Sequence, residues 1–280
     1  MKVALAFSRT SARLRTICTE RTGGVSLANI LSCNLGSYRG HTDAAYEHLP
    51  TIGVKHVEFG LPGADDIPAL MSTLASHGLS ATTVIAGADI ASDAYADQWA
   101  DICERAAELG VKVVFTSVHA GENPREAVFA RLRAAGDVAA SHGIRIAMET
   151  HPDLMTNGTI AMETLWAIDH PSIGMNFDCA NIMYYNEGTT TVAELEKVAS
   201  RVVSVHLKDS AGLYKTWNFP TLGQGVVDFP RVFETLNGVG FYGPFTMELE
   251  GIEGQRFNAE EACADVAASV AYLRSIAEFE

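Results

Sequence analysis

The sequence is poor in positive charge and contains no long apolar run. Its 280 residues include 20 Lys and Arg against 34 Asp and Glu, which gives a formal net charge of −14. Contacts to phosphate groups need an excess of Lys and Arg, so this balance argues against a nucleic-acid partner and against an anionic membrane surface. No apolar run approaches the roughly 20 residues of a membrane-spanning helix. We therefore expect neither a nucleic acid nor a membrane as partner.

Cysteine is also scarce, and its spacing is uninformative for metal or redox chemistry. The five cysteines are scattered and form no C-x-x-C pair: Cys18, Cys33, Cys103, Cys179 and Cys263. In a chain of this length, isolated cysteines are typical of reduced thiols. This pattern predicts a cytoplasmic protein.

The first 26 residues differ in composition from the remainder. They are rich in Arg, Ser and Thr, and residues 1–21 carry five bases against one acid. A transit peptide, a non-native upstream start and a first strand at residues 2–7 all fit this stretch. We expect residues 1–26 to be an extension of uncertain status and residues 27–280 to form the catalytic domain.

One pattern repeats along this domain: an amphipathic helix, a glycine and a short β-branched run. The glycines are Gly53, Gly78, Gly110 and Gly143, and their spacing is that of one strand–helix unit. Seven strands are expected at residues 30–34, 54–59, 111–118, 144–148, 173–177, 202–207 and 245–249, with another after Gly78. Eight such units predict a single-domain α/β fold, the closed (β/α)₈ TIM barrel.

An open doubly wound sheet is the alternative to this barrel. Such a sheet more often carries a glycine fingerprint after its first strand, and the segment "NLGSYRG" is not one. The longest irregular segment is expected at residues 209–226, and loops of this length are often functional.

Charged or imidazole side chains end six of the predicted strands. They are Glu58, His119, Glu149, Asp178, His206 and Glu248. In a TIM barrel the catalytic residues lie at these strand ends. An unpaired charge there would cost several kcal/mol if it were buried, so the pattern needs a compensating partner.

A divalent metal ion would compensate four of them. Glu149, Asp178, His206 and Glu248 supply three carboxylates and one imidazole from four consecutive units. This donor set suits Mn²⁺, Mg²⁺, Co²⁺ or Fe²⁺, and Zn²⁺ is also compatible with it. Taken singly, each residue could instead be a solvated loop acid or a helix cap.

Four segments that contain these residues resemble the xylose-isomerase-like TIM barrel superfamily of sugar phosphate isomerases and epimerases. They are "IAMETHP", "GMNFDCAN", "VVSVHLKD" and "LGQGVVDFPRVFETLNGVGFYGPFTMELE". The resemblance implies one divalent metal ion, Mn²⁺ in the first place, on Glu149, Asp178, His206 and Glu248. It also implies a small carbohydrate-like substrate and a chain that pairs with copies of itself.

The activity that this resemblance implies is isomerisation or epimerisation of a sugar or sugar-like keto-polyol. A proton would move at the carbon next to a metal-coordinated carbonyl. Glu149 and Glu248 lie on non-adjacent strands, so one would remove the proton and the other return it.

A metal-dependent dehydratase or lyase is the alternative within the same superfamily. His151, in "ETHP", resembles the base of 3-dehydroshikimate dehydratase, and Lys208 resembles the H-x-K-D lysine of inosose dehydratases. His151 could instead bind a backbone carbonyl, and Lys208 could simply pair with Asp209.

A nuclease similar to endonuclease IV is the more remote alternative. That enzyme needs a trinuclear zinc cluster and has a histidine where this chain has Asn181. The D-x-H motif that follows its seventh strand has no counterpart in "KDSAGLYKTWNFP".

Further residues are candidates for contacting the substrate. They are Glu58, His119, Asn181 and Trp217. Glu58 would bind substrate hydroxyls or pair with a neighbouring base, and His119 would be a ligand or a packed core residue. Trp217 and Phe219 would form an apolar wall over a sugar ring or pack the loop. The glycines of "LGQG" at residues 222–225 would approach a phosphate or form a turn.

Overall fold

The computed structural model describes residues 28–280, and the expected extension at residues 1–26 lies outside them. Eight parallel strands close into a barrel in chain order, with the last strand paired to the first. These strands are β1 (Leu31–Asn34), β2 (His56–Gly60), β3 (Ser80–Ile85), β4 (Val113–Thr116), β5 (Arg145–Glu149), β6 (Ile173–Asp178), β7 (Val202–Leu207) and β9 (Phe245–Met247).

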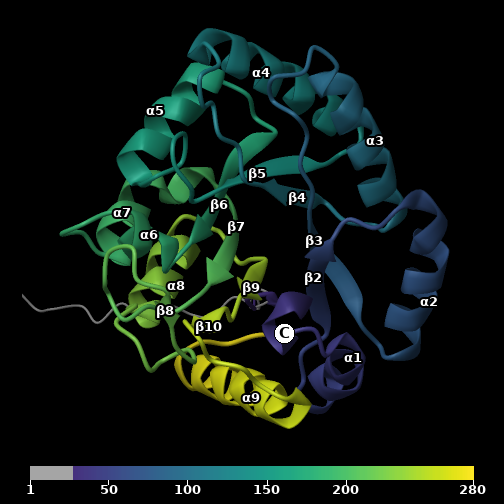
Figure 1. The fold of residues 1–280 in the computed structure, drawn as a ribbon, viewed down its shortest axis with the longest axis vertical. Coiled ribbons are helices and arrows are strands. Elements are labelled where there is room, and N and C mark those ends of the chain that lie inside the picture. Colours follow the sequence, from purple (N-terminus) through teal and green to yellow (C-terminus); the bar gives the residue numbers. More distant parts are fainter. Residues whose placement is uncertain (1–27) are drawn as a thin grey trace, which may run out of the picture.

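Helices surround this barrel as an outer ring (Figure 1). They are α1 (Thr42–Thr51), α2 (Ile67–Ser76), α3 (Tyr95–Glu108), α4 (Arg125–Ser141), α5 (Gly158–Ile168), α6 (Asn181–Tyr185), α7 (Thr191–Val198), α8 (Phe229–Gly238) and α9 (Ala259–Ile276). The first and last helices, α1 and α9, lie side by side and complete the ring. The single-domain (β/α)₈ barrel is confirmed, and the open doubly wound sheet is wrong. No helix in residues 28–280 has the length and apolar character needed to cross a bilayer.

The repeated glycines stop the helices as the pattern predicts. Gly53, Gly78, Gly110 and Gly143 all have positive φ, between 66° and 76°, and each follows the end of a helix closely. Glycine adopts this left-handed conformation without the penalty that a Cβ atom brings. The fourth strand is shorter than expected, because β4 ends at Thr116. His119 therefore belongs to the loop that follows β4.

The long segment at residues 209–226 is more ordered than expected. Within it, β8 (Asn218–Phe219) pairs antiparallel with β10 (Gly251–Ile252). The buried carboxylate of Asp209 accepts hydrogen bonds from four backbone amides at both ends of the segment. The donors are Ser210 (2.8 Å), Gly223 (2.9 Å), Gly225 (2.8 Å) and Val227 (3.1 Å).

Polar side chains occupy alternate positions on several strands, which follows the period of two in a β-strand. Asn176 precedes Asp178 by two residues and Ser204 precedes His206 by two, and the Ser204 hydroxyl donates to Asn176 Oδ1 at 2.7 Å. Both of these supporting residues are fully buried. The ring of Phe115 packs edge-on against the ring of His206 at 4.7 Å between centroids. Buried neighbours thus hold the side chains at these strand ends.

Candidate metal centre and active-site cavity

Four side chains converge at the carboxyl ends of adjacent strands. Glu149 ends β5, Asp178 ends β6, His206 lies in β7, and Glu248 directly follows β9. One ligand atom of each lies within 4.8 Å of the others, so the group can hold a metal ion. His206 Nδ1 is 3.0 Å from Glu149 Oε1, 3.2 Å from Glu248 Oε2 and 3.8 Å from Asp178 Oδ2.

These separations fit the edges of a metal coordination shell. Ligands about 2.1 Å from an octahedral ion lie about 3.0 Å from their neighbours. Both ring nitrogens of His206 are buried and make no hydrogen bond. Buried nitrogens without a partner are costly, and a cation among the three carboxylates would satisfy Nδ1. The residues therefore fit a divalent ion.

Two carboxylates of this group, those of Glu149 and Glu248, are held in their ionised form. Burial alone would raise the pKa of Glu149, but the imidazoles of His151 and His206 hold it well below the ordinary value. Burial likewise opposes ionisation of Glu248, yet the charges on His206 and Lys208 lower its pKa to about 2. Deprotonated oxygens are the form that binds a metal or accepts a proton.

Glu58 lies behind His206, on the side away from the three carboxylates. It is fully buried, and its Oε1 is 3.1 Å from His206 Nε2. Asn34 Nδ2 donates to the same oxygen at 2.9 Å, and the Thr83 hydroxyl donates to the other one. A cavity of about 280 Å³ opens above the metal-binding group, and Glu58 is not among the residues that line it. Its position fits the alternative in which it pairs with a neighbouring base, not contact with substrate hydroxyls.

Lys208 is buried beside the same group. Its Nζ lies 2.8 Å from Asp178, 2.9 Å from Glu248 and 2.8 Å from Glu250. The charges of these carboxylates outweigh burial and raise the pKa of Lys208 well above its ordinary value. The alternative pairing of Lys208 with Asp209 is wrong, because Asp209 binds backbone amides instead.

A cavity of about 280 Å³ opens above these residues. Its lining comprises Ile85, Phe115, Ser117, Glu149, His151, Asn181, Tyr184, Tyr185, Lys208, Trp217, Phe219, Glu248 and Glu250. Five of these residues are aromatic, and the polar ones gather around the metal-binding group. This combination suits a small polar ligand with an apolar face.

The sequence-predicted residues in this cavity have distinct surroundings. His151 Nδ1 is 3.1 Å from Glu149 Oε2. Glu149 raises the pKa of His151 despite its burial, which acts in the opposite direction. Asn181 is buried, and its backbone amide donates to Asp178 Oδ1 at 2.9 Å. Trp217 is 42% exposed and packs edge-on against Phe219 at 5.1 Å between ring centroids.

His119 does not line the cavity. It is exposed in the loop after β4, and a ring nitrogen contacts the carbonyl oxygen of Pro152. Its ring centroid is 6.0 Å from that of His151. The contact with a backbone carbonyl, which was the alternative role for His151, is made instead by the ring of His119.

Several residues of the site were missed by the sequence reasoning. They are Asn34, Ser117, Tyr184, Tyr185 and Glu250. Asn34 ends β1, so the strand-end rule would have found it if uncharged polar residues had been included. Glu250 follows Glu248 at the strand period of two, which was also a usable signal. The two tyrosines end a short helix, α6, and no local pattern marks them.

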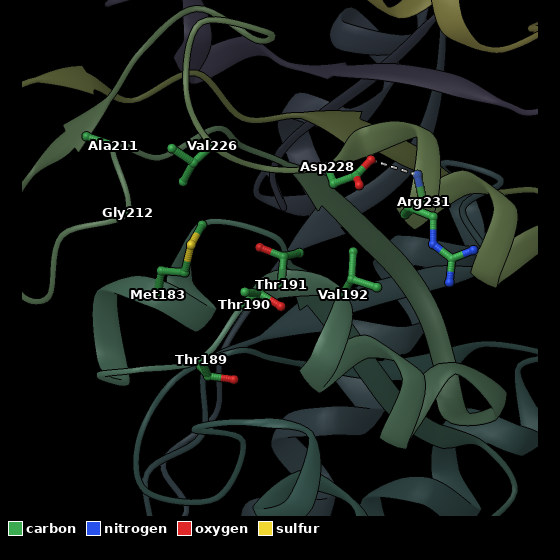
Figure 2. Close-up of a pocket in the computed structure, with 10 residues that line it drawn as sticks. All are labelled: Met183, Thr189, Thr190, Thr191, Val192, Ala211, Gly212, Val226, Asp228 and Arg231. Atoms are coloured by element: carbon green, nitrogen blue, oxygen red, sulfur yellow. Dashed lines mark hydrogen bonds between the residues drawn. The ribbon is translucent and has the colours of Figure 1, made fainter.

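A larger cavity, of about 510 Å³, shares no lining residue with the cavity above the metal-binding group. It is lined by residues of α6, α7, the segment after β7 and the start of α8 (Figure 2). Its polar groups already serve the local structure: Thr190 caps α7, Thr191 donates to the Cys179 carbonyl, and Asp228 accepts from the Arg231 amide. This cavity therefore has no free polar cluster to compare with the metal centre.

The closed parallel barrel, with acidic and imidazole side chains at its strand ends, places this chain among the TIM barrel proteins. The sequence then identifies the family within this class. Residues 47–276 match the xylose isomerase-like TIM barrel family. The chain belongs to this family, as the resemblance predicted.

Curated relatives of this chain include sugar epimerases. The L-ribulose-5-phosphate 3-epimerase UlaE of Salmonella paratyphi A is 31% identical over 136 residues, which are 48% of this chain and 46% of that protein. The chain thus spans about half the length of the curated relatives that it matches.

Solved structures share the fold at lower identity. D-psicose 3-epimerase of Clostridium cellulolyticum H10, with D-tagatose, has a TM-score of 0.72 at 14% identity and covers 89% of this chain and 99% of its own. The probable 3-DHS dehydratase AsbF of Bacillus anthracis has a TM-score of 0.67 at 17% identity, with coverage of 87% and 98%. An epimerase and a dehydratase therefore share this barrel, and the fold does not choose between them.

Proposed function

We propose that the protein is a divalent-metal-dependent isomerase or epimerase of a sugar or sugar-like keto-polyol. The observation that carries this proposal is the convergence of Glu149, Asp178, His206 and Glu248 within 4.8 Å beside a small aromatic-walled cavity. The similarity to sugar epimerases over half the chain supports a carbohydrate substrate.

Glu149 and Glu248 are the proposed proton-transfer groups. Both line the cavity, and both have pKa values held below the ordinary carboxyl value, so each is a free base at neutral pH. They belong to strands that β6 and β7 separate, which allows one carboxylate to reach each face of a planar substrate. Removal of a proton by one and return by the other inverts or relocates the C–H bond.

The remaining residues of the site orient the substrate and compensate the negative charge that forms on it during the reaction. When bound, a divalent ion would supply electrostatic stabilisation of the negative charge that develops on the substrate oxygens. Lys208, within 2.9 Å of Glu248, can donate a hydrogen bond to the same oxygens. Trp217 and Phe219 offer an apolar face to the C–H side of a sugar ring, and the backbone amide of Asn181 donates to Asp178 Oδ1 and so positions that carboxylate.

A dehydratase is the second candidate, and one contact favours it. His151 lines the cavity and lies 3.1 Å from Glu149, so an imidazole base stands next to the proposed proton-transfer carboxylate. In that reaction His151 would remove the proton and Lys208 would protonate the departing hydroxyl.

The experiment is to incubate the Mn²⁺-loaded protein with a panel of ketoses in D₂O and to follow the products by NMR and mass spectrometry. Deuterium incorporation without loss of water supports the isomerase or epimerase. Loss of one water with a new enone absorbance would overturn it in favour of the dehydratase.

Variants complete this test. Glu149→Gln and Glu248→Gln should each lower the exchange rate at least about 100-fold, which is typical for loss of a general acid–base group. Glu163→Gln, on the exposed face of α5, is the matched control and should keep the wild-type rate. Wild-type exchange in both active-site variants would refute the assignment of the two carboxylates.

A further inference from the structure

A second cavity adjoins the one above the metal centre. It has a volume of about 240 Å³ and is lined by Asn34, Gly36, Ser37, Arg39, Trp217, Glu248, Leu249 and Glu250. Trp217, Glu248 and Glu250 also line the first cavity, and Glu248 belongs to the metal-binding group. The two volumes are therefore neighbouring parts of one cleft, and a ligand held at the metal centre can extend into the second part.

Arg39 brings an unused guanidinium to this second cavity. An arginine side chain has five N–H donors. Among residues 28–280 the guanidinium makes no hydrogen bond, and its buried Nη2 has no partner at all. The carboxylate oxygen that Nη2 approaches, Asp265 Oδ2, is 3.9 Å away, which is beyond hydrogen-bond distance. Buried donors without a partner are costly, so this group favours a ligand that brings an acceptor.

The charge of Arg39 is also incompletely compensated within the protein. Burial lowers the pKa of Arg39, and the negative charges of Asp265 and Glu250 offset this effect only in part. The Asp265 carboxylate accepts a hydrogen bond from the Thr221 hydroxyl at 2.6 Å through its other oxygen. A ligand oxygen next to the guanidinium would therefore stabilise a charge that its neighbours stabilise incompletely.

The position of Arg39 is fixed by its neighbours. Its backbone follows a short 3₁₀ helix, Leu35–Tyr38, and has a φ of 53°. The guanidinium carbon lies 5.6 Å from the centre of the Phe257 ring, a cation–π contact. Gly251 packs so closely that a Cβ atom there would be 2.7 Å from Nη2. A donor that is held in place before binding loses less conformational freedom when the ligand arrives.

Uncharged polar groups of this cavity serve the local structure instead. The Gly36 amide donates to Asn34 Oδ1 at 2.8 Å, and the Ser37 hydroxyl donates to the Met247 carbonyl at 3.3 Å. Arg39 is the one base among the residues that line the cavity. It is therefore the charged donor that a ligand meets there.

We propose that the second cavity binds the end of the substrate remote from the metal, and that Arg39 donates hydrogen bonds to an oxygen acceptor on that end. This inference rests on the proposed function, because it names a feature of the substrate of the same site. The acceptor is a hydroxyl or a phosphate oxygen on the chain of a ketose, and a guanidinium donates to either. Arg39 is then a residue that determines specificity for longer substrates.

The test compares dihydroxyacetone, L-ribulose and L-ribulose 5-phosphate on the Mn²⁺-loaded full chain. Dihydroxyacetone has no chain beyond the carbons next to its carbonyl. Proton exchange in D₂O gives kcat and KM, and titration calorimetry gives the Kd of each compound. Arg39→Met keeps an apolar stem but removes every donor. It should weaken binding of at least one five-carbon ketose by about tenfold or more, mainly through KM, and affect dihydroxyacetone far less.

The two five-carbon compounds separate the possible acceptors. A larger loss for the 5-phosphate identifies a phosphate oxygen as the acceptor, and an equal loss for both identifies a hydroxyl. Arg39→Lys keeps the charge without the planar fork, so it should recover part of the affinity. Arg256→Met is the matched control, because Arg256 is exposed and lines neither cavity. A wild-type Kd for Mn²⁺ in each variant would show that the metal-binding group is intact.

Two results would overturn the inference. The first is wild-type affinity of Arg39→Met for both five-carbon ketoses, and the second is a wild type that binds neither of them better than dihydroxyacetone. If Arg39→Met weakens ketose binding but the wild type exchanges no proton, the proposed function fails and the role of Arg39 in binding stands.

Discussion

The carboxylate of Asp209 should be the main support of the segment that carries Trp217 and Phe219. Four amides donate to its two oxygens: those of Ser210 and Val227 to Oδ1, and those of Gly223 and Gly225 to Oδ2. Asp209→Asn replaces one oxygen by an NH₂ group. Whichever way the amide turns, two donors lose their acceptor and face another donor.

The size of this effect follows from the number of amides affected. A donor left without its partner in a buried site costs about 1–3 kcal/mol, so two cost about 2–6 kcal/mol. Urea denaturation would measure the total, and hydrogen exchange at the Gly223 and Gly225 amides would show where protection is lost. Asp228→Asn is the control, because exposed Asp228 caps α8 with a single bond of 3.2 Å to the Arg231 amide. Equal stability of the two variants, with wild-type protection of both glycine amides, would refute the reasoning.

Three further outcomes are expected. Glu58→Gln, behind the imidazole of the seventh strand, should weaken Mn²⁺ binding about 10- to 100-fold by calorimetry; an unchanged Kd would contradict its positioning role. Gly174→Ala brings a Cβ atom within 2.2 Å of Val203 Cγ2, so urea unfolding should show a loss of about 1–3 kcal/mol, and a wild-type midpoint would argue against this clash. Burial opposes ionisation of Glu194, but its hydrogen bonds lower its pKa below 4.5. Its contribution to stability is therefore present at neutral pH and lost as pH falls through the lowered pKa. The difference in free energy of unfolding between the wild type and Glu194→Gln should disappear in acid. The control, exposed Glu196→Gln, should differ little from the wild type at any pH. A difference for Glu194→Gln that persists in acid would contradict this explanation.

The barrel could be predicted from the sequence because its signals are local. Helices that stop at Gly53, Gly78, Gly110 and Gly143 fix the length of each unit, and the strands between them are strongly apolar. The strand that ends at Thr116 was placed too far along the chain because Val118 continues the apolar run. Strand ends are set by pairing with neighbouring strands, which the local pattern does not contain.

The candidate metal ligands were also accessible from the sequence, since a strand end is a local property and the fold brings strand ends together. The surroundings of these ligands were not. Contact between Glu58 and His206 depends on side chains that face each other across the barrel. The pairing of β8 with β10 is likewise made by segments remote in the chain, and two-residue strands carry no periodic signal.

The central claim is that Glu149, Asp178, His206 and Glu248 bind one divalent ion. Titration of the metal-stripped full chain with Mn²⁺, followed by electron paramagnetic resonance of the free ion, tests it most directly. One Mn²⁺ should bind per chain, and Asp178→Asn should weaken this binding at least about 100-fold, whereas Glu163→Gln should bind as the wild type does. Failure of the wild type to bind Mn²⁺ at this stoichiometry, or equal binding by Asp178→Asn, would contradict it.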